Sequence, residues 1–117
     1  MDIRYSCNQR DFKRYTTEEI RNEFLITSLY KPDEVVSVYS HVDRMVTMGC
    51  MPVHEAVSID KGLDVWANFG THYFLERREI SMFNLGGAGT VKADGVEYHL
   101  GYEDCLYLTK GTKEVLF

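Results

Sequence analysis

Short runs of alternating apolar and polar residues, separated by glycine turns, fill the last third of the chain, residues 79–117. Alternation with a period of two is typical of a strand that buries one face. Asp94 and Gly95 stand between two of these runs, 90–93 and 96–100. A two-residue loop of this composition predicts a tight hairpin, because both of its positions need a positive φ. The whole segment therefore predicts a series of short antiparallel strands.

Strand patterns also dominate the middle of the chain. β-branched and aromatic residues are concentrated in 35–39, and a second apolar run extends over 45–53. Gly49 and Pro52 interrupt the second run, which indicates a bulge or an edge strand. The alternation returns at 54–59 and predicts another strand.

Helical signals are few. Thr16 with Glu19 fits a capping box and predicts a short helix that ends near 22–24. Apolar residues spaced over 63–69 indicate one further helical turn before Gly70. Because strands are short and closely spaced elsewhere, we expect an all-β chain, a sandwich or barrel with a short N-terminal helix.

The glycine-rich string 86–89 allows two interpretations. Such strings cradle phosphates when a helix follows, because the N-terminus of the helix then faces the anion. Here a strand pattern follows instead, so we expect a sharp turn between two strands.

Composition narrows the class of protein. The 44% hydrophobic and 26% charged residues predict an ordinary soluble fold, and 117 residues suit one domain with one core. A net charge of −5 argues against a nucleic-acid partner, which would need a basic face. No apolar stretch has the length of a membrane span and the first residues hold no signal-peptide core, so we expect a cytoplasmic protein without a membrane partner. The cysteines fit no zinc motif and are expected to be reduced thiols: Cys7, Cys50 and Cys105.

The order of short strands and glycine turns in 79–117 resembles that of cupin barrels. In those barrels, three histidines and a glutamate from two glycine-flanked motifs usually hold a divalent metal. Glu79 and Gly86 keep the spacing of the glutamate and glycine of the first motif. Counting back from Glu79 with the three-residue spacer of that motif places the histidine pair at Tyr73 and Leu75. Neither side chain is a useful metal ligand. From position 73 onward we expect nearly all of the chain to form short strands.

The second cupin motif is altered as well. Gly101 and Gly111 match its glycines, and Glu114 stands at its histidine position. Glu79 and Glu114 are then the only carboxylates in register, and two carboxylates alone make a poor zinc site. We therefore expect no metal ligand in this chain. The histidines are expected to be surface or hydrogen-bonded core residues: His41, His54, His72 and His99.

A polar cluster that follows the 35–39 run contains weak candidates for catalysis. His41, Asp43 and Arg44 belong to it. Polar residues at the loop ends of a rigid scaffold often bind ligands, although they are more often solvated turns.

The string 76–79 places Arg77 and Arg78 between two glutamates. In a strand, each arginine would share a face with one glutamate. Paired arginines recognise carboxylates, which makes Arg77 and Arg78 weak candidates for binding a sugar acid. Ion pairing at a barrel end or at a contact between subunits is the stronger alternative.

Five strings, taken in order, resemble the N-terminal part of the 4-deoxy-L-threo-5-hexosulose-uronate ketol-isomerase family. The resemblance covers essentially the whole chain. It implies bacterial, cytosolic, zinc-containing enzymes with two cupin domains that assemble as hexamers. It also implies an aldose–ketose isomerisation of 5-keto-4-deoxyuronate to 3-deoxy-D-glycero-2,5-hexodiulosonate in the breakdown of pectin and other polyuronides. The five strings are 21–25, 39–44, 73–79, 86–90 and 110–115.

The resemblance further implies that the zinc ligands lie in a second domain. Residues 1–117 are then expected to form one degenerate cupin domain that is inactive alone, packs against the metal-bearing cupin and builds the homo-oligomer. Two alternatives stay open. One is a stand-alone, non-catalytic cupin that binds a sugar acid, and the other is a metal-independent enzyme in which His41 or a carboxylate is the base.

Overall fold

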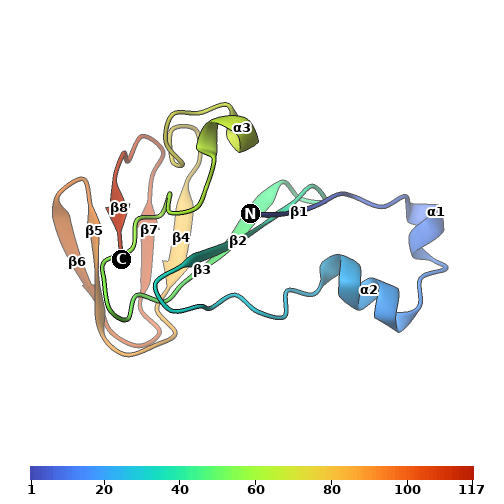
Figure 1. Ribbon diagram of the computed structural model, residues 1–117, viewed down its shortest axis with the longest axis horizontal. Helices are drawn as coiled ribbons and strands as arrows, with labels where there is room; N and C mark the ends of the chain where they lie inside the picture. The colour runs from blue at the N-terminus through green and yellow to red at the C-terminus, as the bar shows by residue number, and fades with distance from the viewer.

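A computed structural model describes all 117 residues, and strands account for most of the regular structure (Figure 1). The three helices are short, and none is long or apolar enough to cross a membrane. The prediction of a β-rich chain with little helix is confirmed. The elements are β1 (Asp2–Arg4), α1 (Gln9–Phe12), α2 (Thr17–Phe24), β2 (Val35–Ser40), β3 (Met45–Cys50), α3 (Val65–Phe69), β4 (Ile80–Phe83), β5 (Gly89–Ala93), β6 (Val96–Leu100), β7 (Cys105–Leu108) and β8 (Val115–Leu116).

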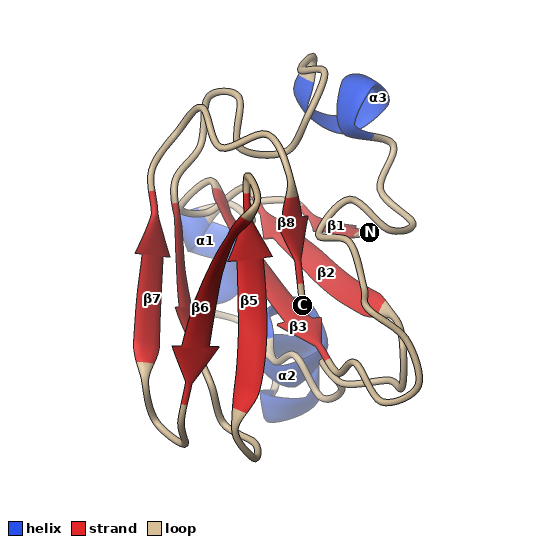
Figure 2. Ribbon diagram, turned by 90° about the vertical axis from the view of Figure 1, so that its left-hand side faces the viewer, coloured by secondary structure: helices blue, strands red, loops and turns tan.

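The strands form three separate sheets. In the first sheet, β1 runs parallel to β2, and β2 pairs antiparallel with β3. The second sheet pairs β4 with β7, and the third places β5 between β6 and β8, with all neighbours antiparallel. Figure 2 shows β5, β6, β7 and β8 standing in front of the β1–β3 sheet.

The expected fold is a cupin-type antiparallel β-barrel or jelly-roll sandwich. The sheets do not close into a barrel, which corrects the barrel form of this expectation, while the jelly-roll sandwich stays a prediction. β3 pairs only with β2 and β4 only with β7, so each of these two strands keeps one free edge. The segment 71–79 consists of turns and irregular chain, although short strands were expected from position 73 onward. Its Phe74 and Leu75 are nevertheless buried, because side-chain packing rather than a hydrogen-bonded ladder holds this segment.

The segment 54–59 is only partly strand-like, although its alternation predicts a strand. Val57 exchanges two backbone hydrogen bonds of 3.0 and 2.9 Å with Phe117, and the Ile59 amide donates to the Val115 carbonyl. Val57 and Ile59 are buried, as the alternation requires. The turns on either side restrict the pairing with β8 to a single bridge.

The hydrophobic core is small, and the molecule as a whole is less compact than a typical domain. Its radius of gyration of 15.8 Å exceeds the roughly 13 Å expected for a compact domain of this length. The excess has a visible cause, since α1 and α2 stand apart from the sheets (Figure 1). The buried residues that pack together in the core are Ile59, Phe74, Leu75, Val91, Ala93, Leu108 and Val115.

The N-terminal helices are stabilised by local contacts. The predicted capping box is present, because the Glu19 amide donates to Thr16 Oγ1 and the Thr16 amide donates to Glu19 Oε2. Neither α1 nor α2 contains a buried residue. Phe12 and Phe24 pack edge to face at 5.7 Å but stay 43% and 40% exposed. These helices therefore present an apolar surface that the rest of the chain leaves uncovered.

The hairpin predicted at Asp94 and Gly95 joins β5 to β6. Both residues have the positive φ that the turn needs, 47° and 84°. The Asp94 carboxylate also accepts a 2.9 Å hydrogen bond from the Glu114 amide, which fixes the hairpin against the start of β8. The glycine-rich string 86–89 is a turn that leads into β5, as predicted.

Candidate functional site

The polar cluster predicted after β2 forms the turn between β2 and β3. His41, Asp43 and Arg44 are all exposed there. The His41 ring stacks on Tyr5 with 4.8 Å between ring centres and meets the Tyr39 ring edge to face at 4.7 Å. The Asp43 carboxylate accepts a 3.4 Å hydrogen bond from the next strand, and Arg44 adopts a φ of 61°. Of the three candidates, His41 alone joins other side chains in a defined arrangement.

The two candidate arginines are separated by the fold. Arg77 is exposed, whereas Arg78 is half-buried. The guanidinium carbon of Arg78 lies 4.3 Å from the centre of the Phe69 ring and 5.6 Å from that of Tyr39. The two arginines therefore differ in their surroundings, because Arg78 packs on aromatic rings and Arg77 is exposed.

The glutamates beside the arginines have other partners. Glu76 accepts a 2.6 Å hydrogen bond from the His72 amide, which holds the pKa of its carboxyl below the ordinary value. Glu79 accepts from the Tyr107 hydroxyl, and this hydrogen bond raises the pKa of Tyr107. Neither glutamate forms an ion pair with Arg77 or Arg78.

His41 and Arg78 thus belong to one group of side chains, which we call the aromatic–arginine cluster. Its rings continue into the core, because Phe69 lies 6.0 Å from Tyr39 and 5.6 Å from the buried Phe74. The cluster consists of Tyr5, Tyr39, His41, Phe69 and Arg78.

The positions in the cluster follow from the elements that carry them. Ile3 of β1 lies opposite Tyr39 of β2, and this parallel register continues until Tyr5 reaches His41. Phe69 is the last residue of α3, and the left-handed conformation of Gly70 (φ 64°) ends the helix there. Segments far apart in the sequence therefore bring the rings together.

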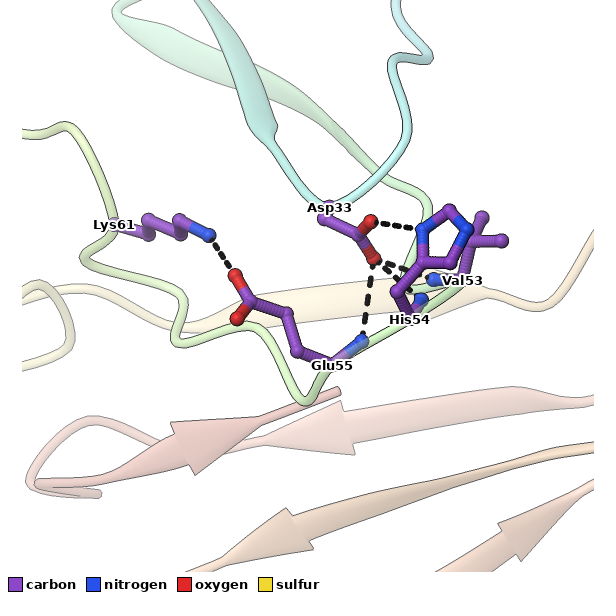
Figure 3. Close-up of polar contacts among 5 residues, drawn as sticks. All are labelled: Asp33, Val53, His54, Glu55 and Lys61. Carbon is purple, nitrogen blue, oxygen red and sulfur yellow. Dashed lines mark hydrogen bonds and ion pairs between the residues drawn. The ribbon is translucent and has the colours of Figure 1, made fainter.

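A polar network that is separate from the aromatic–arginine cluster surrounds Asp33 (Figure 3). Asp33 Oδ1 accepts hydrogen bonds from the backbone amides of Val53 (2.7 Å), His54 (2.8 Å) and Glu55 (3.4 Å), while Oδ2 lies 2.6 Å from His54 Nδ1. These donors, the His54 amide first, lower the pKa of the Asp33 carboxyl far below its ordinary value. Glu55 also pairs with Lys61, and this hydrogen bond raises the pKa of the lysine. The network fixes the loop 53–55 to the turn before β2.

Two larger hollows lie on other parts of the molecule, and neither is lined by the aromatic–arginine cluster. A third hollow of about 50 Å³ is lined by Tyr5 but by no other member of the cluster. An open groove of about 490 Å³ is lined partly by the Asp33-held loop. A more apolar cavity of about 420 Å³ lies between β3 and β4. Its Cys50 is not a ready nucleophile, because burial raises the pKa of the thiol to about 11. The amide group of the Asn84 side chain is already engaged within the protein, because it donates hydrogen bonds to the Leu100 and Gly101 carbonyls.

The residues at the cupin ligand positions do not fit a zinc ion. Leu75 is buried in the core, and Tyr73 is half-buried in the turn segment 71–79. Glu79 is hydrogen-bonded to Tyr107 of β7, while Glu114 lies beside the Asp94 hairpin. Zinc sites take nitrogen, sulfur or carboxylate oxygen donors from three or four converging side chains. The structure contains no group of three histidine, cysteine, aspartate or glutamate side chains placed to hold a metal ion.

The chain is 46% identical, over all 117 residues, to the 4-deoxy-L-threo-5-hexosulose-uronate ketol-isomerases of Escherichia coli O139:H28 (strain E24377A) and O45:K1 (strain S88). The resemblance to the ketol-isomerases is confirmed. A third relative of the same name, from E. coli O9:H4 (strain HS), is 45% identical over the same length. The chain spans 41% of the length of these relatives. No protein-family model matches it.

Two features of the site have no clear signal in the sequence. The Lys31-Pro32-Asp33 string indicates a turn, but the reach of Asp33 to amides some twenty residues away depends on the tertiary fold. The packing of Arg78 on Phe69 likewise joins a loop to a helix end. His41, Asp43, Arg44, Arg77 and Arg78 stay predictions as functional residues.

Proposed function

We propose that this chain is a cupin-type domain of a hexuronate ketol-isomerase. The observation that carries the proposal is the 46% identity to enzymes of that name over every residue of the chain. The antiparallel pairing of β4 with β7 and of β5 with its neighbours, together with the cupin-like glycine spacing, supports the cupin-type assignment. The proposed reaction of the whole protein converts 5-keto-4-deoxyuronate to 3-deoxy-D-glycero-2,5-hexodiulosonate in polyuronide breakdown.

In this proposal the chain supplies structure rather than chemistry. An aldose–ketose isomerisation moves a proton between adjacent carbons through an enediol, which needs a base, or shifts a hydride. Zinc would polarise the reacting oxygens when bound, but its ligands would lie outside residues 1–117, since the cupin ligand positions here hold Tyr73, Leu75, Glu79 and Glu114. The domain alone is therefore proposed to be inactive.

The proposed structural roles are packing against a metal-bearing cupin and assembly of a homo-oligomer, a hexamer as in the family. Two observations support them. The chain spans less than half the length of its relatives, and α1 and α2 bury no residue although they carry exposed phenylalanines. A cytoplasmic location is proposed together with this metabolic role.

A chimaera tests the proposed activity directly. The 117 aligned residues of an E. coli ketol-isomerase are replaced by this chain, and isomerisation of the keto-deoxyuronate is measured for the chimaera and for the 117-residue chain alone. We expect turnover by the chimaera and none by the chain. A folded, zinc-loaded chimaera without activity would contradict the proposal. So would turnover by the chain alone that survives a chelator and disappears in His41→Ala, because His41 would then be the base of a metal-independent enzyme.

The second candidate function is binding of a sugar acid without chemistry. The specific observation that favours it is the half-buried Arg78, which stacks on aromatic rings and has no ionic partner.

A further inference from the structure

Arg78 is the one charged side chain that the fold packs on two aromatic rings and leaves without a counter-ion. It is half-buried, and it takes part in none of the ion pairs of the chain. A buried or half-buried charge is normally paired, because partial loss of water weakens its solvation. The neighbouring glutamates do not supply the pairing: Glu76 and Glu79 are hydrogen-bonded to His72 and Tyr107, and neither forms an ion pair with Arg78.

We propose that the aromatic–arginine cluster binds a sugar acid, with the carboxylate on Arg78 and the sugar ring against the neighbouring aromatic side chains. This inference deepens the proposed function, on which the choice of ligand class rests, by naming residues of this domain that would contact a uronate.

The chemistry of Arg78 suits a carboxylate. Its guanidinium carbon lies 4.3 Å from the centre of the Phe69 ring, and the five N–H donors of a guanidinium lie in its plane. These donors match the two oxygens of a carboxylate in a bidentate pair. Contact with Phe69 and Tyr39 restrains the side chain before any ligand arrives. Less side-chain entropy is then lost when the pair forms.

The aromatic rings around Arg78 indicate which chemical group would accompany the carboxylate in the ligand. Tyr5 is 71% exposed and stacks on His41, which in turn contacts Tyr39. The apolar face of a sugar can pack on an exposed tyrosine ring beside a cation, and the hydroxyl group of the tyrosine can form a hydrogen bond with a sugar hydroxyl. A polyanion such as nucleic acid is disfavoured, because one arginine in a chain of net charge −5 cannot neutralise many phosphates.

The test is a titration of the isotope-labelled chain with D-galacturonate, followed by NMR. We expect saturable shifts at Tyr5, Tyr39 and Phe69, and none with neutral D-galactose at the same concentrations. Arg78→Gln is expected to weaken binding by about tenfold or more, since it removes a charged hydrogen-bonding partner. Arg14→Gln is the matched control and is expected to leave the affinity unchanged, because Arg14 is exposed and lies outside the cluster.

Arg78→Lys keeps the positive charge but loses the planar guanidinium donors that can pair with two carboxylate oxygens. This variant therefore tests the bidentate pair even if Arg78→Gln unfolds the chain. We expect it to weaken galacturonate binding also. The proposal is overturned by an absence of saturable shifts, by equal binding of galacturonate and galactose, by shifts that avoid the cluster, or by equal losses in the Arg14 and Arg78 variants. The chimaera assay measures isomerisation and this titration measures binding by the chain alone, so either can fail without the other.

Discussion

Replacing Leu75 with alanine should destabilise the fold strongly. Leu75 stands where a cupin would place a metal-binding histidine, but here it is 1% exposed and belongs to the core. Its carbonyl also accepts a 2.7 Å hydrogen bond from the Gly111 amide, so the backbone around it has little freedom to collapse into a void. The side chain is therefore expected to contribute its full burial energy.

The magnitude follows from the atoms removed. Leu→Ala deletes three carbon atoms, which corresponds to about 2.4 kcal/mol at about 0.8 kcal/mol per buried methylene. The cavity left behind adds to this loss, and measured costs of this substitution in cores are about 2–5 kcal/mol. We expect about 3–4 kcal/mol, a large share of the roughly 5–15 kcal/mol by which domains are stable.

Urea unfolding followed by far-ultraviolet circular dichroism measures this loss. Leu85→Ala is the matched control, because the same three carbons are removed from a side chain that is 61% exposed. The control should change the free energy of unfolding by no more than about 0.5 kcal/mol. If both variants lost the same small amount of unfolding free energy, Leu75 would not be a core residue. This result would refute the conclusion that Leu75 packs in the core at a position where a cupin has a metal-binding histidine.

Two further predictions concern the close backbone contact of β3 and the Asp33 network. In Gly49→Ala, the new Cβ would lie 2.2 Å from the carbonyl oxygen of Leu29, so we expect a loss of about 1–3 kcal/mol in urea unfolding. Gly87→Ala, with open space around it, should cost much less, and equal costs would refute the clash. The pKa of Asp33 lies below its ordinary value in the folded state, so Asp33 stabilises the fold above about pH 4 and loses this effect as the pH falls toward its folded pKa. Asp33→Asn should therefore lose less stability than the wild type between about pH 5 and pH 3, and parallel pH profiles of the unfolding midpoint would contradict a role for this carboxylate.

Several elements could be predicted because their causes are local. The Asp94-Gly95 hairpin needs only two positions with positive φ, and the helix start at Thr16 needs only a partner three residues later. The strands β2 and β3 follow from β-branched and apolar runs. By contrast, the short β1 and α1 gave no usable periodicity and were not predicted.

The candidate site shows the limit of such reasoning. The sequence identified His41 and Arg78 as candidates, each from its neighbours in the chain. It also suggested that Arg77 and Arg78 act together, whereas the fold leaves Arg77 exposed and packs Arg78 on Phe69. The residues from 73 to 79 could not show that packing and turns would replace the expected strands.

The sequence by itself determined the β-rich character, the main turns and the resemblance to the ketol-isomerases, because each depends on residue types and spacings within short stretches. The tertiary structure alone decided that the sheets stay open, that Leu75 is a core residue, that Asp33 holds the 53–55 loop, and that Arg78 packs on Tyr39 and Phe69. These outcomes depend on contacts between segments far apart in the chain, whose energies come from packing and burial that no local pattern records.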